Sequence, residues 1–283
     1  ISEPLPVATT FDFRDESGWS LSDVARLDTM VTVVDAANLL KDYGSEDFLA
    51  QRGETAGEGD TRTLVELLVE QIEFADVIVL NKTGAASPDN LRAARQIIGS
   101  LNAAARIIET DFGRVALTDI LGTGLFDFGK ASEHPLWFKE LHGFKDHVPE
   151  TEEYGVRSFV YRAKRPFHPA RFKAFLDESW PGVIRAKGFF WLATRPHHVG
   201  EMSQAGALVR SGRLGLWWAS VPPQHWPQDK AAREAIASYS DPVWGDRRQE
   251  LVCIGADPMD EAELRRRRDA CLIEAEAYEP ARW

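Results

Sequence analysis

The first half of the chain alternates short apolar runs with longer segments of helical periodicity. Apolar runs at residues 30–35, 76–80 and 105–109 predict three buried strands. Residues 61–75 carry leucines at helical spacing, and a second helix is predicted to begin at Ser87-Pro88, where a capping serine precedes a first-turn proline. Apolar strands separated by helices predict an α/β fold, with a parallel sheet covered by helices on both faces. Such a sheet binds ligands at the carboxyl ends of its strands.

The second half of the chain differs, because its predicted strands follow one another closely. A helix is predicted to begin at His168-Pro169, with the histidine in a capping or packing role. Asp260 with Glu263 forms an acidic analogue of a capping box ahead of a last helix. The strands are predicted at residues 156–162, 183–193, 214–220 and 249–255. The pattern predicts a smaller α+β module with its helices on one face.

Between the two halves, residues 126–153 lack clear periodicity and mix histidines, prolines and acids, which is typical of a linker. We therefore expect a first domain over residues 1–128, a linker over 129–153, a second domain over 154–275 and a tail over 276–283. Three parallel strands make a poor independent core. No glycine-rich phosphate loop of the form GxxxxGK[ST] occurs in the sequence. The first domain is thus expected to be the back part of a larger nucleotide-binding domain.

Composition and charge narrow the class of protein. The 283 residues are 44% hydrophobic and 27% charged, as in a globular protein. The net charge of −11 argues against nucleic acid as a partner, because a phosphate backbone repels such a surface. The one dense basic run, Arg265 to Arg268, is interpreted as a solvated helix face. No apolar run approaches 18 residues, so no membrane-spanning helix is expected.

The two cysteines, Cys253 and Cys271, lie in apolar periodic segments and form no CxxC motif. Such cysteines are typical of buried free thiols rather than of a disulfide or a zinc site. A reducing, cytoplasmic location is therefore expected.

The tetrapeptide Asn81-Lys82-Thr83-Gly84 follows the second predicted strand, at the ligand edge of the sheet. The guanine-reading motif of small GTP-binding proteins, Asn-Lys-x-Asp, stands at this place. Its amide bonds the base edge, its lysine stem lies along the purine, and its carboxylate accepts two N–H bonds from guanine. Gly84 has no acceptor, and each lost bond to a charged group costs about 1.5–3 kcal/mol. From the tetrapeptide alone, a polar turn that ends a strand is the competing interpretation.

Several segments together resemble the CobW-type metallochaperone GTPases, and they extend over nearly the whole chain. In the first half these are Ile1–Pro6, Val33–Ala36, Asn81–Thr83, Leu101-Asn102 and Ala105–Ile108. In the second half they are Tyr154–Arg162, Arg165–Pro169, Arg185–Ala193 and Gly245–Leu251. The resemblance implies a partial GTP-binding domain of the P-loop type, followed by that family's C-terminal domain.

The resemblance also implies an activity. Members of this family hydrolyse GTP with Mg²⁺ and hand a metal, usually Zn²⁺, to a client metalloprotein. Asn81 and Lys82 match the base-reading positions, Gly84 departs from them, and Thr110 falls near the second base-contacting loop. The family's phosphate loop, Cys-x-Cys-Cys metal motif and acidic switch motif precede the segment that begins at Ile1. The resemblance therefore implies that this chain has no catalytic residues of its own and does not hydrolyse GTP at a useful rate alone.

Two hypotheses for function follow from these observations. The first is the C-terminal portion of a GTP-dependent zinc chaperone, with a remnant of the guanine pocket and a client-binding module. A missing N-terminal segment or a second copy of the chain would then complete the sheet. The second is a stand-alone, non-catalytic interaction protein derived from such a GTPase, which the loss of the acid at Gly84 favours.

Several histidines are candidate metal ligands. His197-His198 is expected in a loop after the strand at 183–193, where the pair either shares a metal ion or belongs to a solvated loop. The histidines of the linker are His134, His142 and His147, which suit transient metal capture or ordinary linker polarity. A zinc site needs about four ligands, so no specific metal site is predicted.

Asp35 and the pair Trp217-Trp218 each allow more than one structural interpretation. Asp35, at the end of its strand, is interpreted as a cap for the following turn rather than as a ligand of a nucleotide-bound metal. Trp217 and Trp218 are expected on one strand, and therefore on opposite faces of it. One of them is expected in the core. The other is expected either at the domain interface or as an exposed anchor for a partner, and the competing interpretation is that the chain itself covers both.

Overall fold

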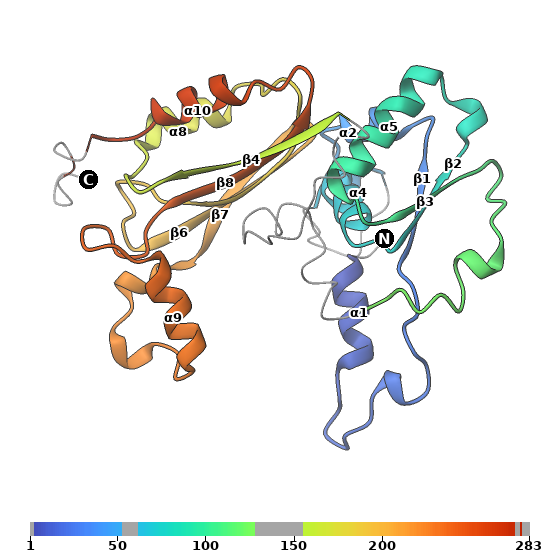
Figure 1. Cartoon of the computed structure of the whole chain (residues 1–283), viewed down its shortest axis with the longest axis horizontal. Helices are drawn as coiled ribbons and strands as arrows, with labels where there is room; N and C mark the ends of the chain where they lie inside the picture. The colour runs from blue at the N-terminus through green and yellow to red at the C-terminus, as the bar shows by residue number, and fades with distance from the viewer. Residues whose placement is uncertain (1–2, 53–61, 128–154, 275–277, 279–283) are drawn as a thin grey trace. The chain divides into compact units, whose positions relative to one another are not determined.

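The computed structural model describes residues 3–52, 62–127, 155–274 and 278 (Figure 1). The chain divides into two compact units, residues 1–157 with 205–208 and residues 158–204 with 209–283. The predicted linker at 129–153 and the predicted tail, apart from residue 278, lie outside the described residues. None of the described helices is long and apolar enough to cross a bilayer.

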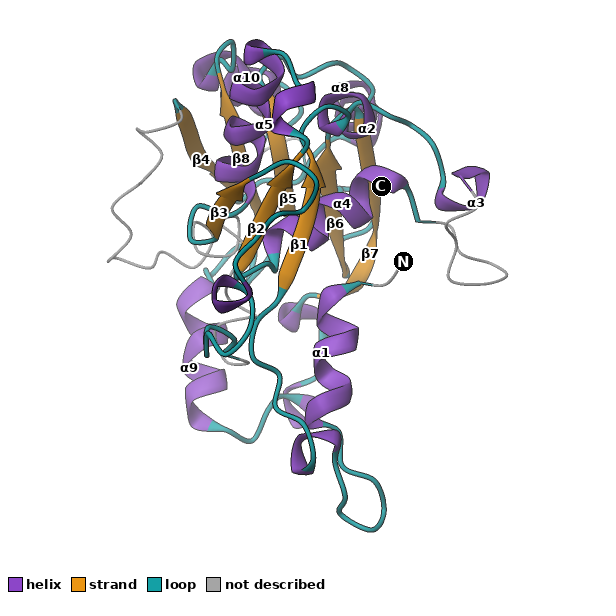
Figure 2. Cartoon of the chain, turned by 90° about the vertical axis from the view of Figure 1, so that its right-hand side faces the viewer, coloured by secondary structure: helices purple, strands orange, loops and turns teal. Residues whose placement is uncertain are grey.

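The first unit is built on a parallel sheet of three strands in the order β1-β2-β3 (Figure 2). The strands are β1 (Val31–Asp35), β2 (Val77–Asn81) and β3 (Arg106–Glu109), which confirms the positions of the three predicted strands. The prediction that all three are buried is wrong for the edge strands, because β1 buries only Val34 and β3 buries none of its residues. The register pairs Asp35 with Asn81 and Leu80 with Glu109, so the three strands end at one edge. All four apolar residues of β2 are buried, so both faces of this central strand are covered.

Two longer helices connect these strands and begin where local capping dictates. Helix α4 (Leu64–Glu73) is preceded by a capping box, in which Thr63 and Glu66 each accept a backbone N–H of the other. Helix α5 (Pro88–Leu101) has Ser87 as its cap, which accepts the N–H of Asn90 at 3.2 Å and confirms the predicted start. The shorter helices of this unit are α1 (Pro4–Asp12), α2 (Leu39–Tyr43) and α3 (Leu49–Arg52), with 3-10 turns η1 (Leu21–Asp23), η2 (Thr83–Ala85) and η3 (Leu117–Asp119).

A buried amide connects the end of α4 with the end of α5. The Nδ2 of Asn102 donates to the carbonyl oxygens of Ile72 at 2.9 Å and Ala75 at 2.8 Å, while its Oδ1 accepts the N–H of Ala105 at 3.1 Å. The carbonyls at the end of a helix have no partners within the helix. The Asn102 side chain supplies a donor for these carbonyls, and its bonds connect the segment that leads into β2 with the segment that leads into β3.

The second unit is a five-stranded sheet in the order β4-β8-β5-β6-β7. Its strands are β4 (Val156–Ala163), β5 (Val183–Phe190), β6 (His198–Ala205), β7 (Leu208–Leu216) and β8 (Gln249–Ala256). Strands β5 and β8 are antiparallel, and Gly188 pairs with Leu251. A Cβ on Gly188, whose φ is +149°, would lie 2.1 Å from the carbonyl oxygen of Glu250. The close approach of these two backbones therefore requires glycine at this position.

Helices α8 (Pro169–Leu176) and α10 (Glu261–Asp269) lie side by side on one face of this sheet, as predicted (Figure 1). His168 caps α8 by accepting the N–H of Arg171 at its Nδ1, and Asp260 caps α10. Helix α9 (Lys230–Tyr239) follows the short turns η5 (Trp218–Ser220) and η6 (Pro223–His225).

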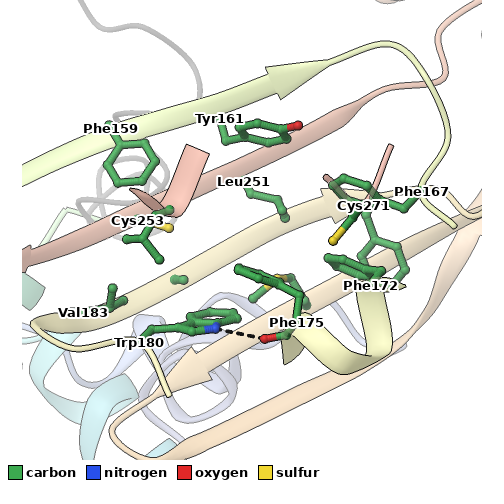
Figure 3. Close-up of a cluster of buried hydrophobic side chains, with 14 of the residues drawn as sticks. Phe159, Tyr161, Phe167, Phe172, Phe175, Trp180, Val183, Leu251, Cys253 and Cys271 are labelled. Atoms are coloured by element: carbon green, nitrogen blue, oxygen red, sulfur yellow. Dashed lines mark hydrogen bonds between the residues drawn. The ribbon is translucent and has the colours of Figure 1, made fainter. Parts of the chain in front are cut away.

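The core of the second unit lies between its sheet and these helices and is rich in aromatic rings (Figure 3). The rings of Phe167 and Phe172 stack at 4.4 Å, and those of Phe175 and Trp180 at 4.8 Å. Trp180 also donates its indole N–H to the carbonyl of Phe175 at 3.1 Å. Both cysteines are buried free thiols, which confirms their assignment from the sequence.

The strand expected at residues 214–220 is wrong in position, because β7 ends at Leu216 and residues 218–220 form η5. Strand β6 had no counterpart among the predicted strands, and His198 opens it rather than lying in a loop. Most of β7 is exposed, so its sequence lacks the apolar alternation of a half-buried strand. Trp217 is buried, whereas Trp218 begins a 3-10 turn and does not share a strand with it.

The basic run at 265–268 is not a uniformly solvated face. The Arg268 side chain is fully buried, four residues after the buried Leu264 on the inner stripe of α10. Its guanidinium lies 5.1 Å from the ring centre of Phe175 and 5.6 Å from that of Trp180, and its Nη2 contacts the Cys253 Sγ at 2.8 Å. The aromatic cage accepts the cation because the ring faces carry negative charge.

Candidate nucleotide-binding site

The polar residues of the candidate site gather at the carboxyl edge of the first sheet. Asp35 and Asn81 are register partners at the last positions of β1 and β2, and Thr110 directly follows β3. Lys82 takes the left-handed conformation, with φ at +60°, which turns the chain away from β2. Phe112 takes it in the loop after β3, with φ at +56°. Ligands of parallel sheets bind at this edge.

Asn81 and Thr110 are brought together, and each stabilises the loops around it. Asn81 Oδ1 accepts the backbone N–H of Gly113 at 3.0 Å. The Thr110 hydroxyl donates to the carbonyl oxygen of Arg114 at 2.9 Å, and the Thr110 carbonyl accepts the N–H of Thr83 at 3.3 Å. The contact of Thr110 with a base stays a prediction, because its hydroxyl is used within its own loop.

Lys82 points to Asp35. Its Nζ donates to Asp35 Oδ2 at 2.7 Å, while Asp35 Oδ1 accepts the N–H of Ala37 at 2.9 Å and Asn38 Nδ2 donates to Oδ2 at 2.8 Å. Burial raises the pKa of Asp35, but the bonds from Lys82, Asn38 and Ala37 together hold that pKa below its ordinary value. Asp35 therefore caps the turn, as expected. Its two oxygens accept four donors, because the backbone N–H of Asn38 also lies 3.2 Å from Oδ1, so the lone-pair sites of Asp35 are filled and it offers no free ligand for Mg²⁺.

Asp111 also lies at this edge, and the sequence analysis did not identify it as a site residue. Its carboxylate accepts the backbone N–H of Gly84, which lies 3.0 Å from Oδ1 and 3.2 Å from Oδ2. The Thr83 hydroxyl lies 3.4 Å from Oδ2. An acid one residue beyond Thr110, in a chain that lacks the acid at position 84, is the signal that could have revealed it.

The loop after β3 also presents an aromatic ring. Phe112 is 88% exposed, and the Arg114 guanidinium lies 5.8 Å from its ring centre. An exposed aromatic ring in a loop that also holds a carboxylate can stack on a planar ligand. The site thus combines an amide, a carboxylate and an aromatic ring around the ends of β2 and β3.

The second unit contains a separate cavity of about 520 Å³ at the start of β6, lined by both His197 and His198 together with Arg195 and Arg213. Burial lowers the pKa of His198, and the charges of Arg213, His197 and Arg195 lower it further. The neighbouring arginines repel a cation, which makes the histidine pair a poor zinc site. Among the described residues, no group of three or more His, Cys, Asp or Glu side chains is placed to hold a metal ion. The three linker histidines lie outside the described residues.

Comparisons with known protein families match both halves of the chain. Residues 1–109 match the CobW/HypB/UreG nucleotide-binding domain, and residues 156–272 match the cobalamin synthesis protein cobW C-terminal domain. The first match contains the three strands and the edge that holds Asn81 and Lys82.

Individual relatives are similar over nearly the whole chain. The zinc-regulated GTPase metalloprotein activator 1 of Dictyostelium discoideum is 42% identical over 277 residues, which cover 96% of this chain and 58% of the relative. Zinc chaperone Rv0106 of Mycobacterium tuberculosis is 29% identical over 265 residues, covering 91% of this chain and 60% of the relative. The chain thus spans about three-fifths of the length of these relatives. Among solved structures, the Zn(II)-bound YjiA GTPase of E. coli is 17% identical, with a TM-score of 0.34 and a coverage of 95% of this chain and 68% of that chain.

Proposed function

The chain belongs to the CobW/HypB/UreG family, and from this we propose that it is part of a GTP-dependent zinc chaperone. In this proposal the first unit binds the guanine base of the nucleotide. The CobW C-terminal domain engages the client metalloprotein that receives the metal. Zn²⁺ is the cargo of the reaction rather than a resident cofactor.

The arrangement of side chains at the ends of β2 and β3 is the observation that supports nucleotide binding by the first unit. Asn81 ends β2 and Thr110, 29 positions later in the sequence, directly follows β3, and hydrogen bonds connect the loops that begin there. A base that enters this edge meets hydrogen-bonding side chains from two loops, and the Asn81–Gly113 bond holds these loops together before any ligand arrives. A preorganised site of this kind loses less entropy when it binds a ligand.

The metal and the client are supported by similarity. One relative is named a zinc-regulated GTPase metalloprotein activator and another a zinc chaperone, and we extend zinc and a client metalloprotein to this chain from those names. We assign no described residue as a zinc ligand. We also assign none as a ligand of the Mg²⁺ that accompanies GTP, because Asp35 is engaged by Lys82 and Asn38.

A second candidate function is a non-catalytic interaction protein that derives from such a GTPase. Gly84 favours it, because this glycine stands where guanine readers have an acid.

No GxxxxGK[ST] motif occurs among the 283 residues, and phosphoryl transfer depends on groups placed around the phosphates. We therefore expect the isolated chain to bind guanine nucleotides without turning them over.

Calorimetric titration of the 283-residue chain with GTP, GDP and ATP, with and without Zn²⁺, tests the proposal. GTP and GDP are expected to bind at least tenfold more tightly than ATP, and Zn²⁺ is expected to change the affinity for GTP. Arg195→Gln, in the separate cavity of the second unit, serves as a matched control that keeps this preference.

Equal affinity for all three nucleotides would contradict the proposed guanine binding. An affinity for GTP that does not respond to Zn²⁺ would contradict the coupling to zinc. Release of phosphate over many turnovers, abolished by chelation of Mg²⁺, would show the chain to be a GTPase in its own right.

A further inference from the structure

We propose that Asp111 is the acid that reads guanine in this protein, in the role that Gly84 cannot fill. This inference rests on the guanine-nucleotide binding proposed above. It assigns the specificity for the base to a residue in the loop after β3 rather than to the loop after β2.

The geometry around Gly84 places the Asp111 carboxylate in the space that a side chain at position 84 would enter. A Cβ built on Gly84 would have three neighbours closest to it, and all three are carboxyl atoms of Asp111: Oδ2 at 3.1 Å, Oδ1 at 3.4 Å and Cγ at 3.5 Å. An aspartate side chain at 84 would therefore extend into this carboxylate. The loop after β3 delivers an acid to the place where the loop after β2 lacks one.

Glycine at 84 and aspartate at 111 form a matched pair. The Gly84 N–H donates to the Asp111 carboxylate, with distances of 3.0 and 3.2 Å to its two oxygens, and this bond orients the acid. Two aspartates at these positions would instead bring like charges within a few ångströms, which is unfavourable in a partly buried site. The presence of one acid thus accounts for the absence of the other.

The charge of Asp111 is also uncompensated within its loop. Two other carboxylates at this edge are ion-paired, Asp35 with Lys82 at 2.7 Å and Glu109 with Arg95 at 2.6 Å. Asp111 forms no ion pair with any lysine or arginine of the described residues, and its hydrogen-bond donors are the backbone of Gly84 and the hydroxyl of Thr83. An ionised carboxyl has about four lone-pair sites, so these two donors leave acceptor capacity for a ligand.

Guanine has the donors that such a carboxylate can accept. Its N1–H and its exocyclic N2–H point from the same edge, and two parallel bonds to a carboxylate are both strong and specific. Adenine presents an acceptor at N1 and no amino group at C2, so it would face the carboxylate with a lone pair. Asp111 therefore favours guanine and rejects adenine by the same contact.

The decisive variant is Asp111→Asn, because it keeps the size of the side chain and changes its hydrogen bonding. An amide accepts the N1–H of xanthine and donates to its C2 carbonyl oxygen, whereas it cannot accept both donors of guanine. We expect the affinity for GDP to fall at least tenfold and the affinity for xanthosine diphosphate to rise by a similar factor. A purely structural role for Asp111 would not produce this gain. The measurement is competition of GDP, xanthosine diphosphate and ADP against a fluorescent guanine nucleotide on the wild-type chain, and direct titration of each on the variants.

Two further variants complete the test. Glu109→Gln removes a neighbouring carboxyl of the same edge and is expected to leave the base preference unchanged. Gly84→Asp combined with Asp111→Ser moves the acid to the other loop, and we expect it to restore the preference for GDP over xanthosine diphosphate. Gly84→Asp alone is expected to lower the midpoint of thermal unfolding more than it does in the Asp111→Ser background.

The outcomes separate the two proposals. A wild-type preference for GDP over ADP that Asp111→Asn leaves intact would overturn the role of Asp111 and leave the proposed guanine binding in place. A wild-type chain that binds GDP, xanthosine diphosphate and ADP equally, or binds none of them, would overturn both. A switch from GDP to xanthosine diphosphate in Asp111→Asn would support both.

Discussion

The side-chain oxygen of Asn81 accepts the backbone N–H of Gly113 at 3.0 Å, and this bond joins the loop after β2 to the loop after β3. The two residues are 32 positions apart in the sequence. The bond means that Asn81 supports the shape of the candidate site, in addition to its proposed contact with the base. A loss of nucleotide binding in an Asn81 variant therefore has two possible causes, and they can be separated.

We predict that Asn81→Ala destabilises the first unit by about 1 kcal/mol, the net value of one hydrogen bond. The amide of Gly113 should then exchange with solvent faster, whereas Asn81→Asp keeps the acceptor and should preserve its protection. Hydrogen exchange followed by NMR at Gly113 measures this directly. Unchanged exchange at Gly113 in Asn81→Ala would show that the bond does not hold the loop.

The pair of Asp35 and Lys82 predicts a pH dependence of stability. Burial raises the pKa of Asp35, but the bonds from Lys82, Asn38 and Ala37 hold it below its ordinary value of 3.8. The folded state therefore favours the ionised form, and this contribution is fully present above about pH 4 and disappears as the pH falls through the lower pKa of the folded state. Urea unfolding from pH 6 to pH 3 should show a smaller loss of stability for Asp35→Asn than for the wild type. Parallel curves for the two proteins would contradict the assignment.

We predict that single substitutions of Asn102 strongly destabilise the first unit. Its buried Nδ2 donates to the carbonyls of Ile72 and Ala75, and its Oδ1 accepts the N–H of Ala105. Asn102→Leu leaves these buried groups without the bonds that Asn102 provides and should cost about 2–4 kcal/mol, because each unsatisfied group costs about 1–3 kcal/mol. Asn102→Asp keeps the acceptor but replaces the donor by a charge that the carbonyls repel, so it should cost at least as much at pH 7. Equilibrium denaturation measures both variants, and a loss below about 1 kcal/mol in each would refute this role.

We predict that substitutions of Arg268 by alanine, methionine and lysine differ in stability in an unusual order. The side chain is fully buried among aromatic rings, so Arg268→Ala should leave a cavity and cost about 3–5 kcal/mol. Arg268→Met fills the volume without a charge and should cost less than about 1.5 kcal/mol. Arg268→Lys retains a compact, strongly hydrated charge that the site cannot solvate, so it should be less stable than the methionine variant. Thermal unfolding of the three variants gives the order, and a methionine variant as unstable as the alanine variant would show that the guanidinium, and not its volume, stabilises α10.

The features that could be predicted from the sequence depend on residues close together in it. Ser87 caps α5 by accepting an N–H three positions later, and Asp260 does the same for α10, so each helix start follows from a short segment. The apolar run of β2 is buried because the central strand of a covered parallel sheet has no polar face, whereas the edge strand β1 buries only Val34. The place of Asn81 at the end of β2 follows directly from where that apolar run stops.

The remaining features depend on residues that meet only in the folded chain. Strand β6 and the mostly exposed β7 have little apolar alternation, so the neighbours with which they pair, and not their composition, make them strands. Arg268 is buried because α10 turns this side toward the aromatic rings of distant segments, which no count of charges along the helix reveals. Asp111 contacts Gly84 because parallel strands bring their carboxyl ends to one edge, across 27 positions of sequence. Local hydrogen bonding and hydrophobic periodicity thus specified the elements and the motif, while the packing of those elements selected the partners of each side chain.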